Sequence, residues 1–340
     1  MFCDKLTEKA IVLSDNPLAK TKNGNIAGIK KSSTYIFRGI KYANAERFHM
    51  PSKVGPWENS KPAVSYGYVC PERTTPIGYD AQVCPHYYMP QDENCQYLNV
   101  WTQTLDQDAK KPVLLWLHGG GFAAGSSIEQ QAYDGENMSK YGDAVVVSLN
   151  HRLNILGYLD LSPFGEKYAN SGNAGNADMV AALRWIHDNI AAFGGDPENV
   201  TIFGQSGGGM KVWTLMQTPS ADGLFHKGVI QSGLIDGFVS GKKQDGTKIV
   251  QALLEELGFG SDEVEMLETV PYSTLAEAYN KVSPALAKQG EYIGGNPIPN
   301  EFYVGDPREV GFTEHAKTIP VMAGTVFGEF AFGPAIAGKY

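Results

Sequence analysis

Apolar residues along the chain form several short continuous runs, each followed by a glycine-rich turn or by a helical pattern. The runs at 111–118 and 143–150 are almost wholly apolar, which is typical of strands in a parallel sheet that is covered on both faces. Between later runs, the segment 177–193 has apolar residues at helical spacing, beginning with Met179 and Leu183. Strands that alternate with helices in this way predict an α/β fold with a mostly parallel central sheet and helices on both faces.

The pattern changes toward both ends of the chain. Short alternating strands within 24–43 predict an antiparallel start to the sheet, and the weakly periodic residues 44–96 predict long ordered loops. In 247–287, helical runs follow one another with no strand between them, so we expect a helical insertion over the sheet within 240–315. Strand character returns at 318–325.

One serine stands between a predicted strand and a predicted helix. The strand residues at 199–203 lead into Gly204-Gln-Ser-Gly-Gly208, and the helical run 210–216 follows. This is the G-x-S-x-G pattern of a nucleophile elbow, in which a strained serine needs small neighbours and lies at the N-terminus of a helix. Three fixed residues in five also recur by chance in a chain with 39 glycines, so the flanking strand and helix carry the interpretation. We predict that Ser206 is a nucleophile.

A second glycine-rich turn, His118-Gly-Gly-Gly-Phe122, directly follows the strand at 111–118. It matches the H-G-G-G motif whose backbone amides form the oxyanion hole of lipases and esterases. Adjacent glycine amides can point toward one site because no Cβ obstructs them. We predict Gly120 and Gly121 as oxyanion donors, with the amide of Gly207 as the third. A flexible loop is the alternative interpretation, and the strand that runs straight into the turn disfavours it.

Composition narrows the classes of partner and cofactor. The chain carries 28 Lys and Arg against 37 Asp and Glu, a net charge of −9 without a basic cluster, which argues against nucleic acid and against an anionic membrane as partners. No apolar run has the length of a membrane span, and the first residues lack the apolar stretch of a signal peptide. We therefore expect a cytoplasmic protein, with secretion left open.

The four cysteines form no C-x-x-C pair, so we expect no metal site, and no motif calls for an organic cofactor. In an exported protein, Cys95 could pair with Cys70 or with Cys84, and the sequence does not decide between them. In a cytoplasm we expect buried thiols instead.

Several segments resemble the type-B carboxylesterases, the family of the cholinesterases and para-nitrobenzyl esterases. The segment Phe37–Ala43 is similar to the family's F-x-G-I-P-Y-A strand, Glu93–Asn99 to its E-D-C-L-x-L-N signature, and Ala191–Val200 to the segment before its elbow. The elbow departs from the usual G-E-S-A-G-G, since Gly207 stands in place of alanine. The resemblance extends over nearly the whole chain.

The resemblance implies an α/β-hydrolase fold for a single catalytic domain over residues 1–340. It implies hydrolysis of small-molecule carboxylic esters through an acyl-enzyme on Ser206. It also implies that Glu329 is the acid of the catalytic triad, because Gly324–Phe330 is similar to the family's G-T/V-N-x-D-E-G segment. Two neighbours of this glutamate differ from the family's residues, and a surface carboxylate is the alternative interpretation.

No histidine of this sequence stands where the order of the catalytic triad requires the base. In α/β-hydrolases the triad follows the order serine, acid, histidine, but every histidine of this chain precedes Glu329. The seven are His49, His86, His118, His151, His187, His226 and His315. The family's histidine lies further along, so the resemblance implies that the chain lacks the C-terminal part of the domain and that a second polypeptide could carry the histidine. A non-catalytic scaffold or interaction protein of the same fold, or an inactive fragment, is the alternative. The sequence indicates neither the acyl and alcohol specificity nor the oligomeric state.

Overall fold

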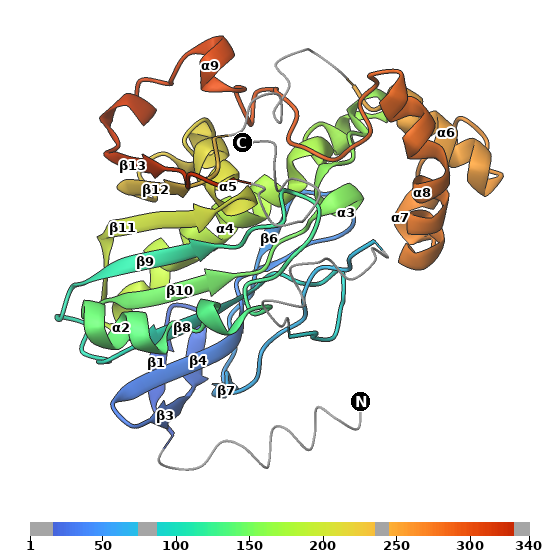
Figure 1. Cartoon of the computed structure of the whole chain (residues 1–340). Helices are drawn as coiled ribbons and strands as arrows, with labels where there is room; N and C mark the ends of the chain where they lie inside the picture. The colour runs from blue at the N-terminus through green and yellow to red at the C-terminus, as the bar shows by residue number, and fades with distance from the viewer. Residues whose placement is uncertain (1–15, 74–86, 235–244, 330–340) are drawn as a thin grey trace.

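The computed structural model describes residues 16–73, 87–234 and 245–329 (Figure 1). The strands are β1 (Leu18–Thr21), β2 (Gly24–Ala27), β3 (Ile29–Lys31), β4 (Thr34–Lys41), β5 (Ala43–Asn44), β6 (Ser52–Lys53), β7 (Lys61–Pro62), β8 (Tyr97–Thr102), β9 (Lys111–Leu117), β10 (Val145–Leu149), β11 (Gly195–Gln205), β12 (Lys227–Gln231) and β13 (Val321–Gly324). The α-helices are α2 (Glu136–Gly142), α3 (Asn154–Tyr158), α4 (Ala174–Asn189), α5 (Gly207–Leu215), α6 (Thr247–Leu257), α7 (Met266–Thr269), α8 (Tyr272–Lys288) and α9 (Pro307–Val310).

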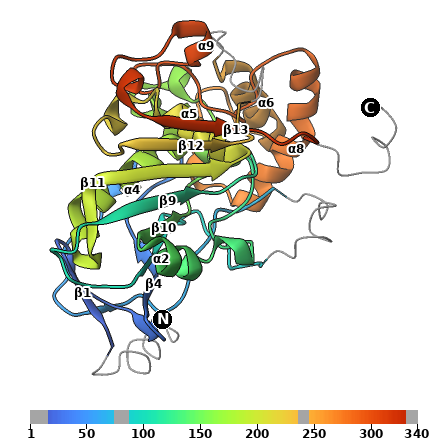
Figure 2. The same ribbon diagram turned by 60° about the vertical axis from the view of Figure 1, so that its left-hand side comes forward.

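An eight-stranded sheet organises the described part of the chain, in the order β13-β12-β11-β9-β10-β8-β4-β3 (Figures 1 and 2). The strands from β13 to β10 are parallel to one another, whereas β8, β4 and β3 join in antiparallel fashion. The predicted mostly parallel sheet with an antiparallel start is therefore confirmed. The two most apolar runs of the sequence are β9 and β10, which lie in the middle of the sheet.

Alternate side chains of the central strands face two different helical layers. Val113, Leu115 and Leu117 of β9 lie in the main core, together with apolar residues of α4 and α5. On the opposite face, Trp101 and Val146 belong to a smaller cluster. Gly135, which precedes α2, packs on both of these side chains. The helices thus cover both faces of the sheet, as the sequence predicts.

A second core lies among the helices that follow β12. Leu253 of α6 and Leu275 and Tyr279 of α8 pack with Leu159 and Leu161, which follow α3. Figure 1 shows α6, α7 and α8 grouped together at one end of the sheet. No strand interrupts residues 245–320, where the sequence places a helical insertion. That residues 240–315 form a separate helical insertion over the sheet stays a prediction.

The element bounds differ from expectation where short elements or glycines are involved. The helices α2 and α3 have only 7 and 5 residues, too few for a helical period to emerge from the sequence. The helix expected at 177–193 is α4 followed by a short 3-10 helix, Ile190–Phe193, and it ends at Gly194, whose φ of 76° favours glycine. Pairing with β9 already begins at Gly195, so β11 starts four residues before the predicted strand.

The two described cysteines are neighbours. Cys70 and Cys95 are both buried and both free thiols, and they share a small cluster with Leu153 and Leu156. Burial, with a hydrogen bond from the Cys95 thiol to the Cys70 side chain, raises the pKa of Cys95 well above its ordinary value. Cys84, the other candidate partner of Cys95, lies outside the described residues, as do Cys3 and His86. In the described ranges, no helix has the length and apolar character needed to cross a membrane.

Candidate active site

Ser206 lies at the junction between β11 and α5, with the backbone of a nucleophile elbow. Its φ of 55° and ψ of −122° are strained for a residue with a side chain. Its N–H donates to the carbonyl of Gln231 at 2.8 Å, which ties the turn to the end of the neighbouring strand β12. The serine is partly exposed, and it begins the helix whose first amides carry the positive end of the dipole.

The glycines on either side of the serine allow three backbone segments to meet. A Cβ on Gly204 would lie 2.5 Å from the carbonyl carbon of Gly208, and one on Gly208 would lie 2.0 Å from the carbonyl oxygen of Leu117. Real Cβ atoms do not approach so closely, so larger residues at these positions would push α5 away from the end of β9. The pattern of small residues therefore has a steric cause.

The predicted oxyanion loop packs directly against this elbow. A Cβ on Gly207 would lie 2.2 Å from the amide nitrogen of Gly121, and one on Gly119 would lie 3.9 Å from the Cβ of Ser206. Gly120 and Gly121 have φ values of 81° and 63°, which a side chain would disfavour. Within the described part of the chain, the amides of Gly120 and Gly121 donate to no other group. The structure thus brings the three predicted donor residues and Ser206 together.

Below the loop lies a group of buried polar side chains. The Nδ1 of His118 donates to the carbonyl of Gly119 at 2.9 Å, and its ring stacks on that of His151 with centroids 5.2 Å apart. The Nζ of Lys211, on α5, donates to the carbonyl of His118 at 2.8 Å. Burial, followed by the nearby charge of Lys211, lowers the pKa values of both histidines well below the ordinary value.

Glu329 lies past the carboxyl end of β13. Because β11, β12 and β13 are parallel, the elbow after β11 lies at the same end of the strands. The Oε1 of Glu329 accepts from the Oγ1 of Thr325 at 2.6 Å and from the N–H of Val326 at 3.0 Å. A hydrogen bond from the Ser232 side chain is the largest cause of its lowered pKa, and the bonds from Thr325 and Val326 add to it. Ser232 follows Gln231, the residue bonded to the Ser206 amide, so a short chain of contacts links the serine with the glutamate.

None of the six described histidines bonds to Ser206 or Glu329. His118 and His151 are buried below the oxyanion loop, and His49 lies 3.4 Å from Glu268. The others accompany surface carboxylates: His187 and His226 lie near Glu198, and His315 lies near Asp222. None of the described histidines is therefore placed to act as the base for Ser206.

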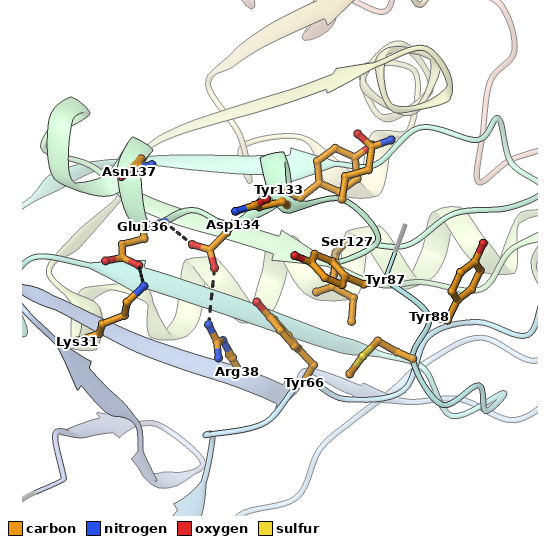
Figure 3. Close-up of a pocket in the computed structure, with 14 residues that line it drawn as sticks. Lys31, Arg38, Tyr66, Tyr87, Tyr88, Ser127, Tyr133, Asp134, Glu136 and Asn137 are labelled. Atoms are coloured by element: carbon orange, nitrogen blue, oxygen red, sulfur yellow. Dashed lines mark hydrogen bonds and ion pairs between the residues drawn. The ribbon is translucent and has the colours of Figure 1, made fainter. Parts of the chain in front are cut away.

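A cavity of about 600 Å³ lies elsewhere, between β4 and the segment that leads into α2 (Figure 3). Tyr133 lines it together with Tyr66, Tyr87 and Tyr88. Its charged side chains pair with one another: Arg38 faces Asp134 at 3.6 Å, and Lys31 bonds Glu136 at 2.6 Å. No predicted catalytic residue lines this cavity.

Sequence reasoning missed two polar residues of the candidate site. Ser232 carries a weak signal, because it directly follows a strand, as does the segment that holds Glu329. Lys211 carries a clearer one, since a lysine interrupts the otherwise apolar and small residues of α5. A charged residue on the otherwise apolar helix that follows a nucleophile indicates a buried polar contact near the site.

Comparison with known proteins gives the family. The carboxylesterase family matches residues 15–337. The para-nitrobenzyl esterase of Bacillus subtilis is 33% identical over 92% of this chain and 63% of its own length, and the phenmedipham hydrolase of Pseudarthrobacter oxydans is 35% identical over 94% and 64%. A solved esterase of Clostridium hathewayi is 60% identical, with a TM-score of 0.92 over 95% of this chain and 64% of that one.

The chain therefore spans somewhat less than two thirds of the length of these relatives. Its solved neighbours include a para-nitrobenzyl esterase that is 31% identical, with a TM-score of 0.78 over 94% of this chain. The chain has the α/β-hydrolase fold and belongs to the carboxylesterase family.

Proposed function

We propose that the chain forms part of a serine hydrolase that cleaves small-molecule carboxylic esters through an acyl-enzyme. Ser206 attacks the ester carbonyl, and the amides of Gly120, Gly121 and Gly207 receive the negative charge that develops on its oxygen. The observation that carries the proposal is the strained, partly exposed Ser206 beside two glycine amides that donate to no described group. Family membership supports the same chemistry.

We assign Glu329 as the acid that orients the catalytic histidine. Its three donors keep its pKa low, so it is ionised at neutral pH and can accept a hydrogen bond from an imidazole N–H. None of the six described histidines reaches it, and all seven histidines of the chain precede Glu329, whereas the order in α/β-hydrolases is serine, acid, histidine. We therefore propose that the histidine is supplied by a second polypeptide or by a longer chain. The serine alcohol is a poor nucleophile until that histidine takes its proton.

A fluorophosphonate probe tests the assignment, because only an activated serine reacts quickly with it. The chain is mixed with the part of the Clostridium hathewayi esterase that this chain does not cover. We expect labelling of Ser206 and hydrolysis of a para-nitrophenyl ester, on the order of 10⁶-fold faster than with the chain alone. Ser206→Ala should abolish both, and Glu329→Gln should reduce turnover on the order of 10⁴-fold.

Two outcomes would contradict the proposal in different ways. Full activity of the 340-residue chain alone, with its mass verified, would mean that the base is already present. Lack of labelling in a mixture shown to form a stable complex would instead favour a non-catalytic scaffold. The Clostridium hathewayi relative is described as an esterase that can hydrolyse aliphatic aromatic polyesters, so we include such a polyester in the substrate panel.

A further inference from the structure

Lys211 is a fully buried lysine whose hydrogen-bond partners are the carbonyls of the oxyanion loop. It lies on the second turn of α5, with none of its surface exposed. Its Nζ donates to the carbonyl oxygen of His118 at 2.8 Å and to that of Gly119 at 3.4 Å. No carboxylate in the described residues lies within ion-pair distance of it. A buried cation without a counter-ion is costly, so these two carbonyls are its main compensation.

The geometry of the peptide bond turns these contacts into a constraint on the predicted oxyanion donors. A trans peptide is planar, and its C=O and N–H point in opposite directions. The carbonyl of Gly119 and the amide of Gly120 belong to one such plane. Because Lys211 and His118 both bond to this carbonyl, the amide of Gly120 points away from these two side chains.

The carbonyl of Gly120 is held by the N–H groups of Ala123 and Ala124 at 3.2 and 3.1 Å, whereas the orientation of the 119–120 peptide depends on the bonds to the Gly119 carbonyl. Gly120 and Gly121 both have positive φ, and glycine samples either sign of φ with similar ease. A rotation of the 119–120 peptide would remove one donor from the site and leave a carbonyl in its place. Lys211 is anchored on the same helix that Ser206 begins, so it fixes the loop relative to the nucleophile itself.

We propose that Lys211 is a positioning residue that holds the 118–121 loop in the orientation that presents the Gly120 and Gly121 amides to Ser206. This inference deepens the proposed function and rests on it for the meaning of the loop. The contact itself is a property of the free protein and needs no chemistry at Ser206. It can therefore be tested separately.

The proton on Lys211 gives the contact a measurable signature. Burial lowers the pKa of Lys211 to about 7, and the more distant Glu129 opposes this shift. The titratable groups nearby are His118 and His151, whose pKa values lie well below the ordinary histidine value, so they should titrate at lower pH than the lysine. A change at the loop near pH 7 thus reports on Lys211.

Backbone NMR of the 340-residue chain labelled with ¹⁵N-glycine tests the proposal. We expect the Gly120 and Gly121 amide resonances to shift with a single-proton midpoint near pH 7. In Lys211→Met this midpoint should vanish, and the order parameters of both amides should fall from the rigid value of about 0.85 toward about 0.6. Lys211→Gln, which is neutral but still donates, should keep the loop rigid and lose the midpoint.

Lys41→Met is the matched control, because Lys41 is a partly buried lysine on β4 that bonds Asn94. It should leave both amide titrations unchanged. The proposal is wrong if both amides stay as rigid in Lys211→Met as in the wild type, or if a wild-type midpoint persists in Lys211→Met. Where the methionine variant does not fold, Lys211→Gln decides, because a midpoint that persists there contradicts the proposal. Failure of the ester-hydrolase proposal would appear instead as absent probe labelling with these titrations intact.

Discussion

At the scale of single residues, the candidate site depends on positions where a Cβ has no room. The steric conflict is sharpest at Gly207, where an added Cβ would meet the nitrogen, Cα and oxygen of Gly121 at 2.2, 2.4 and 2.6 Å. These atoms are backbone, which cannot move aside as a flexible side chain can. The usual G-E-S-A-G-G elbow of the type-B carboxylesterases has alanine at this position. In this chain, the loop lies too close to the elbow for that residue.

Gly207→Ala should therefore impair this protein although it restores the family's usual residue. Displacement of the loop would misplace one or two donors, and the loss of one oxyanion donor reduces turnover by about 10²- to 10³-fold. We expect a loss of about that size in probe labelling and ester hydrolysis, measured with the histidine-bearing segment present. Gly142→Ala is the control, since nothing lies within 4 Å of a Cβ there. Equal rates for the two variants would show that the loop moves aside at little cost.

At the scale of elements, one buried ion pair joins the segment after β10 to the helix α4. The Nε and Nη2 atoms of Arg152 donate to the two carboxylate oxygens of Asp178 at 2.8 and 2.7 Å. The remaining Nη1 donates to the carbonyls of Glu46 and His49, in the loop after β5. Both charged side chains are at most 1% exposed. This single guanidinium thus fixes three segments that are far apart in sequence.

Asp178→Ala should destabilise the fold by about 3–5 kcal/mol, because it leaves Arg152 buried without its counter-charge. The measurement is the free energy of unfolding in urea. Asp188→Ala, on the same helix, removes an exposed pair with Lys22 at 2.6 Å and should cost at most about 1 kcal/mol. If both variants unfold at the same urea concentration, the buried pair contributes no more than a surface pair.

At the scale of the whole molecule, the sheet has an open edge beside the candidate site. β13 pairs with β12 on one side, and no described strand pairs with its other side. Its side chains are exposed, with Met322 at 70%, and Val326 just beyond it is at 62%. Exposed apolar edge strands favour pairing with another chain. This edge strand leads directly into the segment that carries Glu329. The proposed catalytic histidine has to lie beside Glu329 in order to bond to it.

We expect the histidine-bearing segment to protect β13 when it binds. In hydrogen–deuterium exchange of the chain mixed with the uncovered part of the Clostridium hathewayi esterase, amides of residues 321–324 should exchange at least about tenfold more slowly, because a strand edge gains partners. β3, at the opposite edge of the sheet, is the internal control and should not change. Protection of neither edge, in a mixture that nonetheless gains activity, would place the segment elsewhere.

The sequence by itself determined the central architecture. Buried parallel strands have to be apolar on both faces, so β9 and β10 stand out as continuous runs, and the strained elbow can form only between small residues. The linear pattern therefore placed Ser206, the two glycine-rich turns and the order of strands and helices. It also placed Glu329 beyond a strand, through the family's motif. The sequence pattern did not predict the short helices α2 and α3, because a helical period of apolar residues cannot be recognised in 5 to 7 residues.

Only the tertiary structure decided which distant groups meet. Lys211 below the oxyanion loop, Ser232 beside Glu329 and the pair of Arg152 with Asp178 are contacts between segments that no local periodicity connects. Contacts of this kind depend on the order of the strands in the sheet and on which side chains fit in the closely packed core. The spacing of residues along the sequence determines neither of them. The close approach of Gly121 to Gly207 likewise follows from how β9 and α5 pack, which turns a substitution that looks harmless in the motif into a steric conflict.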